Sequence, residues 1–344
     1  MAANTTWWTE VSGPARFIRN IVESASAQKS VILSVPDDIP FEIEFVDTLT
    51  RSLQNEFSGH SVTYIAGADG SPSEYFMSRC CKRETRAQFR PKPGFTAAHF
   101  LAGTPTVTMH GGCFLVDLAD QCDLSEWTSF VSTYLSAVKG SISPATFILL
   151  SRGKTAPKAV KGLRAIDYRS FATQFDAYAY CAIRVSDISE PAVIKTYLAD
   201  LAASLTEGNV EHAESALYVY REFLDDPIRF MRMHFPLLEM ADDELEKRVW
   251  ESQIKCIFPI IEQYRCSLVG KYHKAISALL PLENPLGDDY VNAEDVELGS
   301  LLFLSKNGLI IESDDYFRLR KFVFARNELA HLSVLGIDVM RELI

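Results

Sequence analysis

The order of apolar and polar positions divides the chain into two stretches of different periodicity. Up to about residue 187, short β-branched and apolar runs alternate with segments whose apolar residues recur every three to four positions. The runs predict strands at residues 29–35, 61–66, 113–117, 146–150, 163–168 and 178–185. The intervening segments predict helices at 12–28, 41–57, 96–102 and 127–138. Strands that alternate with helices indicate a three-layer α/β domain with a largely parallel sheet.

After Glu190-Pro191 the pattern is helical throughout. It predicts helices at residues 192–205, 210–224, 242–280, 294–306 and 315–332. Pro259 and Gly270 predict a kink or a break in the longest of these helices. The sequence therefore predicts an α/β domain over residues 1–190 and an all-α helical bundle over residues 191–344.

The first half has the rhythm of a nucleotide-binding domain, but no phosphate-binding loop follows its first predicted strand. The residues there are Ser34-Val35-Pro36-Asp37-Asp38-Ile39-Pro40, without glycine or lysine. A P-loop needs glycines, so that backbone N–H groups wrap phosphate, and a Lys and a Ser or Thr. Asp117 has the position of a Walker-B acid, although acids are common at strand ends. We expect a Rossmann-like or degenerate NTPase-like domain without NTP hydrolysis.

The last predicted helix carries Arg326-Asn327-Glu328-Leu329-Ala330-His331. At about 100° per residue, Arg326 shares a stripe with Leu319, Phe322, Val323 and Ala330. A cation in an apolar seam needs a carboxylate, a phosphate or a cleft, because an unpaired buried charge is costly. Asn327 and His331 are one turn apart on the neighbouring face, and histidine is the side chain best suited to proton transfer near neutral pH.

This motif, late in a helical C-terminal region, resembles the Arg-x4-6-His signature of HEPN-domain ribonucleases. In that family a polar residue commonly follows the arginine, as Asn327 does here. Arg229 and His234 fit the same spacing but lack the Asn and the Ala-His ending. The resemblance covers at most the last third of the chain.

The resemblance implies an endoribonuclease that needs no metal ion and uses the 2′-hydroxyl of RNA as the nucleophile. The implied catalytic residues are His331, which transfers a proton, Arg326, which stabilises charge on the phosphoryl oxygens, and Asn327, which orients the phosphate or the histidine. Family members pair their motif helices across two protomers. A homodimer is therefore expected, with Arg326 facing the partner and RNA as the substrate.

A net charge of −11 disfavours broad nucleic-acid binding, so any RNA contact must be local. On the motif helix, the candidate RNA-binding residues are Arg318, Arg320 and Lys321. A second basic run offers candidate contacts to a ligand or its phosphate, at Arg79, Lys82, Arg83 and Arg86. The alternative interpretation of that second run is a solvated helix or loop.

The histidines and cysteines do not point to a metal. No Cys-x-x-Cys occurs among the seven cysteines, and no histidine has metal-ligand spacing with a Cys, Asp or Glu. We expect no metal, no cofactor, and a reduced cytoplasmic protein. No uncharged apolar run reaches 18 residues and the start of the chain does not resemble a signal peptide, so no membrane association is expected.

Two other functions stay open at this stage. In the first, Arg326 and His331 are packing and salt-bridge residues, with Glu328 or Asp295 as the ion-pair partner, and the chain is a non-catalytic adaptor with a helical dimerisation domain. In the second, the α/β half binds a nucleotide-like ligand or a protein partner and controls the nuclease. That domain order resembles bacterial antiviral effectors that bind cyclic oligoadenylate, which suggests host defence or toxin-like RNA cleavage.

Overall fold

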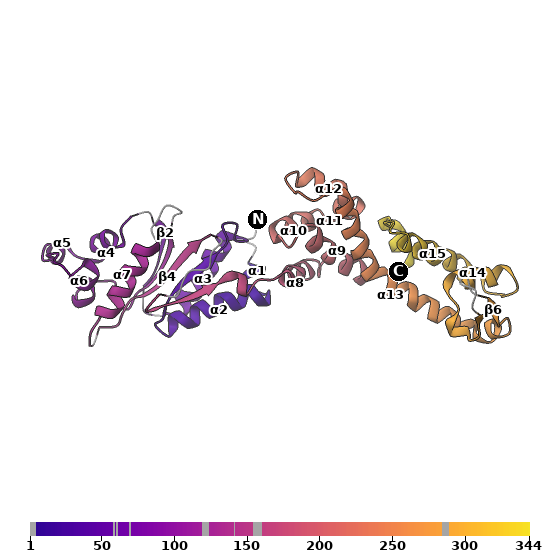
Figure 1. Ribbon diagram of the computed structural model, residues 1–344, viewed down its shortest axis with the longest axis horizontal. Coiled ribbons are helices and arrows are strands. Elements are labelled where there is room, and N and C mark those ends of the chain that lie inside the picture. Colours follow the sequence, from indigo (N-terminus) through magenta and orange to yellow (C-terminus); the bar gives the residue numbers. More distant parts are fainter. Residues whose placement is uncertain are drawn as a thin grey trace. The chain divides into compact units, whose positions relative to one another are not determined.

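The computed structural model describes residues 5–57, 59, 61–68, 70–118, 124–140, 142–153, 160–283 and 289–344. The chain forms two compact units, residues 1–176 and 177–344 (Figure 1). The first unit contains a five-stranded sheet, and the described residues of the second unit are helical apart from two short antiparallel strands and the connecting segments. Helix α8 (Gln174–Arg184) contains the point of division.

The sheet of the first unit is wholly parallel, as its periodicity predicts. Its strand order is β2-β3-β4-β1-β5. The strands are β1 (Ser30–Val35), β2 (Val62–Ala68), β3 (Cys113–Leu118), β4 (Thr146–Arg152) and β5 (Leu163–Asp167). Every residue of β1 and β3 is buried, which explains their continuous apolar sequences, because parallel sheets are covered on both faces.

Helices cover both faces of this sheet. Alternate residues of β3 and β4, such as Phe114 and Phe147, join one core with α4, α6 and α7, and the buried ring of Phe76 packs on both. Helix α2 contacts β1 and β4, and α3 contacts β2. The helices of this unit are α1 (Thr6–Thr9), α2 (Ser12–Ser26), α3 (Glu42–Glu56), α4 (Pro72–Cys80), α5 (Arg83–Arg86), α6 (Ala97–Gly103), α7 (Leu124–Ala137) and the 3-10 turn η1 (Tyr168–Ser170).

The strand predicted at residues 178–185 is wrong, because this segment belongs to helix α8. Its buried residues Ala177, Tyr180 and Cys181 are spaced as on one helical face. A short apolar run rich in Tyr, Cys and Ile does not by itself distinguish a buried strand from a helix. The burial of one helical face identifies the segment as a helix.

The second unit contains α9 (Ala192–Leu205), α10 (Val210–Tyr218), α11 (Tyr220–Asp225), α12 (Pro227–His234), α13 (Asp242–Ser277), the hairpin strands β6 (Leu282–Glu283) and β7 (Asp289–Tyr290), η2 (Ala293–Asp295), α14 (Leu298–Lys306), α15 (Ser313–Ala330) and α16 (Ile337–Leu343). The predicted helix at 210–224 is divided at Val219. Helix α13 runs through both Pro259 and Gly270 and leaves helical geometry only at Tyr272, so the predicted break is displaced.

Helix α13 organises this unit, since α9, α12 and α15 all contact it. The rings of Tyr264 in α13 and Phe322 in α15 stack with centroids 4.0 Å apart. The buried Gln253 amide donates to the Leu335 carbonyl and accepts from the Leu335 N–H, at 2.7 and 2.8 Å, which fixes the chain after α15. Within the described ranges, no helix has both the length and the apolar character needed to cross a membrane.

Candidate functional site

Helix α15, which carries the Arg326–His331 motif, is anchored to α13 near both ends. In its first turn the Asp315 carboxylate accepts hydrogen bonds from Lys271 Nζ at 2.7 Å and Tyr272 Oη at 2.6 Å. The Lys271 bond, followed by the Tyr272 bond, lowers the pKa of Asp315. At the other end, Trp250 Nε1 donates to the Leu329 carbonyl at 2.7 Å. The backbone that carries the motif is thus held in place from both sides.

Arg326 does not lie in the buried seam of α15, contrary to its predicted position. The buried stripe is formed by Leu319, Phe322, Ala325 and Leu329. Arg326 lies on the flank of this stripe, and its side chain is 42% exposed. Its guanidinium is 3.4 Å from Glu297 Oε2 and donates to Asn327 Oδ1 at 3.4 Å. The carboxylate partner is therefore Glu297, not Glu328 or Asp295.

A cavity of about 420 Å³ lies beside Arg326. Its lining includes the side chains of Glu283, Glu297, Ser300 and Phe303. Glu297 pairs with Arg326 there and Glu283 adds a second acidic residue to the lining, so a phosphate group that approaches Arg326 competes with Glu297.

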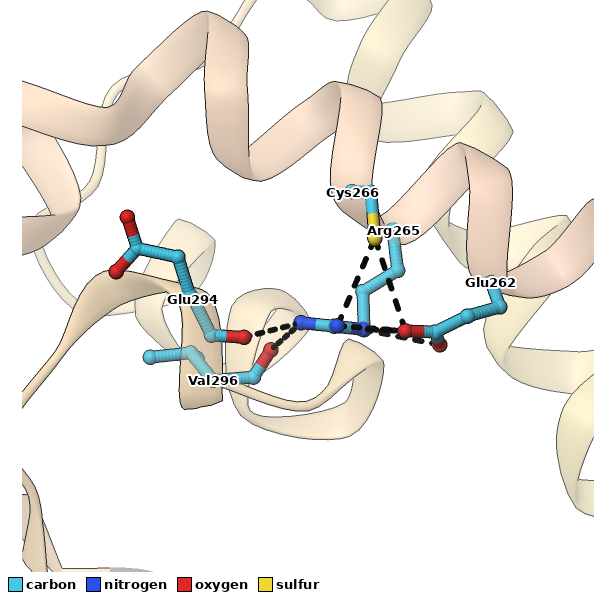
Figure 2. A network of polar contacts seen from close by, with 5 residues as sticks. All are labelled: Glu262, Arg265, Cys266, Glu294 and Val296. Atoms are coloured by element: carbon cyan, nitrogen blue, oxygen red, sulfur yellow. Dashed lines mark hydrogen bonds and ion pairs between the residues drawn. The ribbon is translucent and has the colours of Figure 1, made fainter.

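A polar network holds the segment that carries Glu297 (Figure 2). From α13, Arg265 donates to the backbone carbonyl oxygens of Glu294 and Val296, at 2.6 and 3.2 Å. The same guanidinium bonds the Glu262 carboxylate at 2.6–3.0 Å, and this bond raises the pKa of Arg265. Because Glu297 directly follows Val296, Arg265 positions the partner of Arg326.

Asn327 and His331 are exposed to solvent. His331 caps the helix, and its backbone N–H donates to the carbonyl oxygens of Asn327 and Glu328 at 3.0 and 3.1 Å. In the described part of the chain, the His331 imidazole has no hydrogen-bond or ion-pair partner. Phe317 and Phe324, 58% and 52% exposed, precede His331 at heptad spacing and lie on the same side of α15. The structure thus joins Arg326 to Asn327 but leaves His331 by itself.

The predicted RNA-binding cations of α15 point to different neighbours. Arg318 lies over the rings of Tyr264 and Phe322, at 5.4 and 5.9 Å from their centroids. Lys321 Nζ is 3.0 Å from Glu342 Oε2. Arg320 is exposed and has no ion pair among the described residues. Two of the three cations, those of Arg318 and Lys321, are therefore engaged by side chains of the chain itself.

In the first unit, the candidate phosphate contacts are Arg79 at the end of α4, Lys82, and Arg83 and Arg86 in α5. All four side chains are exposed, and none forms an ion pair with a described residue. They remain available to an anionic ligand.

The carboxyl edge of the sheet holds a separate ion-pair cluster. Arg152, at the end of β4, bonds Asp117 at the end of β3 with Nη2 to Oδ2 at 2.9 Å, and it also bonds Glu42 in α3. Tyr64 donates to Asp117 at 3.2 Å. Burial, and then the negative charge of Asp117, raise the pKa of Tyr64 to about 12. The carboxylate in the Walker-B position is therefore paired with Arg152 within the chain.

Comparison of the chain with protein-family models and with curated proteins finds no match. Within the described residues, no group of three or more His, Cys, Asp and Glu side chains is arranged to hold a metal ion. The sequence did not point to Glu297, Arg265 or Arg152, because each is brought to its partner only by tertiary folding.

Proposed function

We propose that the chain is an endoribonuclease of the HEPN type, which cleaves RNA at a composite site formed by the α15 helices of two copies. The observation that carries this proposal is the exposed imidazole of His331, which has no partner among the described residues and lies at the end of a helix anchored at both ends. Asn327 is exposed one turn earlier. A general acid or base acts best when its backbone is rigid and its ring is free to meet the substrate.

The proposed reaction forms a bond between the RNA 2′-oxygen and the adjacent phosphorus and breaks the bond to the 5′-oxygen. The products are a 2′,3′-cyclic phosphate and a 5′-hydroxyl. One imidazole accepts the 2′-hydroxyl proton and another donates a proton to the leaving oxygen. Because one chain supplies a single motif histidine, the second comes from His331 of the other copy. Arg326 stabilises the negative charge on the phosphoryl oxygens.

The exposed aromatic residues of α15 support pairing through this helix. Phe317 and Phe324 lie on the His331 side and leave apolar surface in water.

The ion pair between Arg326 and Glu297 does not block this role. The side chains of Arg326 and Glu297 are 42% and 60% exposed, and Arg326 Nη2 is 3.4 Å from Glu297 Oε2. An exposed pair of this kind contributes about 0–1 kcal/mol. A substrate phosphate that forms charge-assisted hydrogen bonds can therefore replace Glu297.

A second candidate function is a non-catalytic adaptor that pairs through α15. It is favoured by the two carboxylates beside Arg326, which oppose the approach of phosphate. In this alternative, Arg326 and Glu297 join α15 to the start of α14, and the α/β unit binds the ligand or partner. In the ribonuclease proposal the same unit targets or controls cleavage, in a setting of antiviral defence or toxin-like activity that rests on the family resemblance.

Incubation of the purified protein with total RNA in excess EDTA tests the proposal. We expect cutting that leaves cyclic phosphate ends and that is lost in His331→Ala. The matched control is His234→Ala, because Arg229 and His234 have the same spacing on α12. Cutting that needs added Mg²⁺, or equal activity of both variants, contradicts the proposal. Absent cutting, with a dimer that His331→Ala leaves intact, favours the adaptor.

A further inference from the structure

The net negative charge of the chain comes from its helical unit. Residues 1–176 contain 17 Lys and Arg and 17 Asp and Glu, whereas residues 177–344 contain 17 and 28. The net charge of −11 therefore belongs to the second unit, and the α/β unit is neutral. Within that neutral unit, residues 79–92 contain six basic side chains and a single acid, Glu84. A polyanion is thus repelled less by the first unit than by the second.

A groove of about 860 Å³ lies on the α/β unit, between helices α6 and α7, which contact each other (Figure 1). One wall carries Phe95 and His99, and the lining also includes Lys139 and Lys161. The α7 wall presents three hydroxyl side chains, those of Ser132, Thr133 and Ser136. None of the described residues that line the groove carries a carboxylate. Its polar lining therefore suits an anion.

The polar side chains of the groove are available as hydrogen-bond donors. His99 Nδ1 accepts the N–H of Thr96 at 3.3 Å, so the neutral imidazole carries its proton on Nε2. Lys139 and Lys161 are exposed and form no ion pair with any residue that the structure describes. Phosphate oxygens are the ligands that such ammonium, imidazole and hydroxyl donors bind.

An exposed aromatic ring lies where the basic segment meets the groove. Phe95 is 39% exposed, and its ring centroid is 6.4 Å from that of Phe89 and 6.0 Å from that of His99. Two backbone hydrogen bonds, at 2.9 and 3.3 Å, join Phe95 to Lys92. Proteins that bind single strands combine a basic groove with aromatic side chains on which bases stack.

From this arrangement we infer that the groove between α6 and α7 binds a single-stranded nucleic acid. Lys139, Lys161 and the cations of residues 79–92 contact its phosphates, and Phe95 stacks on a base. The inference rests on the charge and geometry of the α/β unit and does not require that the helical unit cleaves RNA.

Fluorescence anisotropy of the full chain with labelled oligothymidine DNA, 12 nucleotides long, tests this inference. This probe has no 2′-hydroxyl, so the proposed cleavage cannot consume it, and a failed ribonuclease assay leaves the result interpretable. We expect Lys139→Gln with Lys161→Gln to weaken binding at least tenfold and to reduce the slope of log K against log salt by about 1.4, at about 0.7 per lost contact. Phe95→Ala is expected to weaken binding about fivefold or more.

The matched controls are Lys29→Gln, an exposed lysine elsewhere on the same unit, and Lys306→Gln on the helical unit. Both are expected to bind like the wild type, and thermal unfolding checks that all variants are folded. If the groove variants and the controls lose equal amounts of binding affinity, the inference is overturned. Binding that does not depend on salt also overturns it. Competition by thymidine monophosphate or inorganic phosphate as strong as that by the oligonucleotide also overturns it, because the site then takes a small anion.

Discussion

Arg265 is expected to hold the segment before α14 in place, and its replacement tests the network that positions Glu297. Arg265→Ala removes two hydrogen bonds to backbone carbonyl oxygens, at 2.6 and 3.2 Å, and the bonds to Glu262. The Arg265 side chain is 19% exposed, so each carbonyl bond is assigned about 1.5 kcal/mol, the low end of the range for charged donors. The half-exposed pair with Glu262 adds about 0.3–0.5 kcal/mol. The expected loss in the free energy of unfolding of the helical unit is therefore about 3 kcal/mol.

Hydrogen exchange measured by mass spectrometry along a denaturant series assigns this loss to residues 177–344, since the two units need not unfold together. Arg265→Lys keeps the charge but cannot bridge both carbonyls and the carboxylate, so an intermediate loss is expected. Arg320→Ala is the control, because Arg320 is exposed and has no ion pair among the described residues. If Arg265→Ala changes the unfolding free energy and the exchange of residues 293–298 no more than Arg320→Ala does, the network does not hold this segment.

Three further outcomes are expected. Phe76→Ala removes a fully buried ring that contacts five other rings, so it is expected to destabilise the α/β unit by about 3–5 kcal/mol; a loss below about 1 kcal/mol in denaturant unfolding contradicts this packing. Glu297→Gln frees Arg326, so RNA cleavage by the proposed ribonuclease is expected to rise severalfold, and a loss of cleavage with the fold retained contradicts the competition between Glu297 and phosphate. The hydrogen bonds from Lys271 and Tyr272 lower the pKa of Asp315, so their stabilisation is present above the ordinary carboxyl pKa of about 3.9 and is lost as the pH falls through the lowered value. The unfolding free energy of the wild type is therefore expected to fall more steeply on acidification than that of Asp315→Asn, and parallel pH profiles contradict this assignment.

The parallel sheet could be predicted because its inner strands β1, β3 and β4 are largely continuous apolar runs. Strands β1 and β3 lie within a residue or two of their predicted bounds, since burial on both faces leaves little room for polar residues. The run at residues 178–185 is equally apolar, and only its packing as part of α8 shows that it is helical.

The candidate site could be predicted only in part. Periodicity correctly predicted that the motif lies on a helix, but it predicted the wrong buried face of that helix. Ala325 and Ala330 both suit a core position in the sequence, and only Ala325 is buried. The ion pair of Arg326 joins residues 29 positions apart, which no local pattern reveals. Likewise, Lys139 and Lys161 line one groove because the fold brings them together.

Mixed pairs of the wild-type chain and His331→Ala test the composite site most directly. The two chains are co-expressed with different tags, and the mixed pairs are purified and assayed on RNA in EDTA. We predict that the mixed pair cleaves RNA no better than the His331→Ala pair, because the shared site then holds one imidazole where the reaction needs two. Mixed pairs with about half of the wild-type activity would contradict the two-copy site, because each wild-type chain would then cleave by itself.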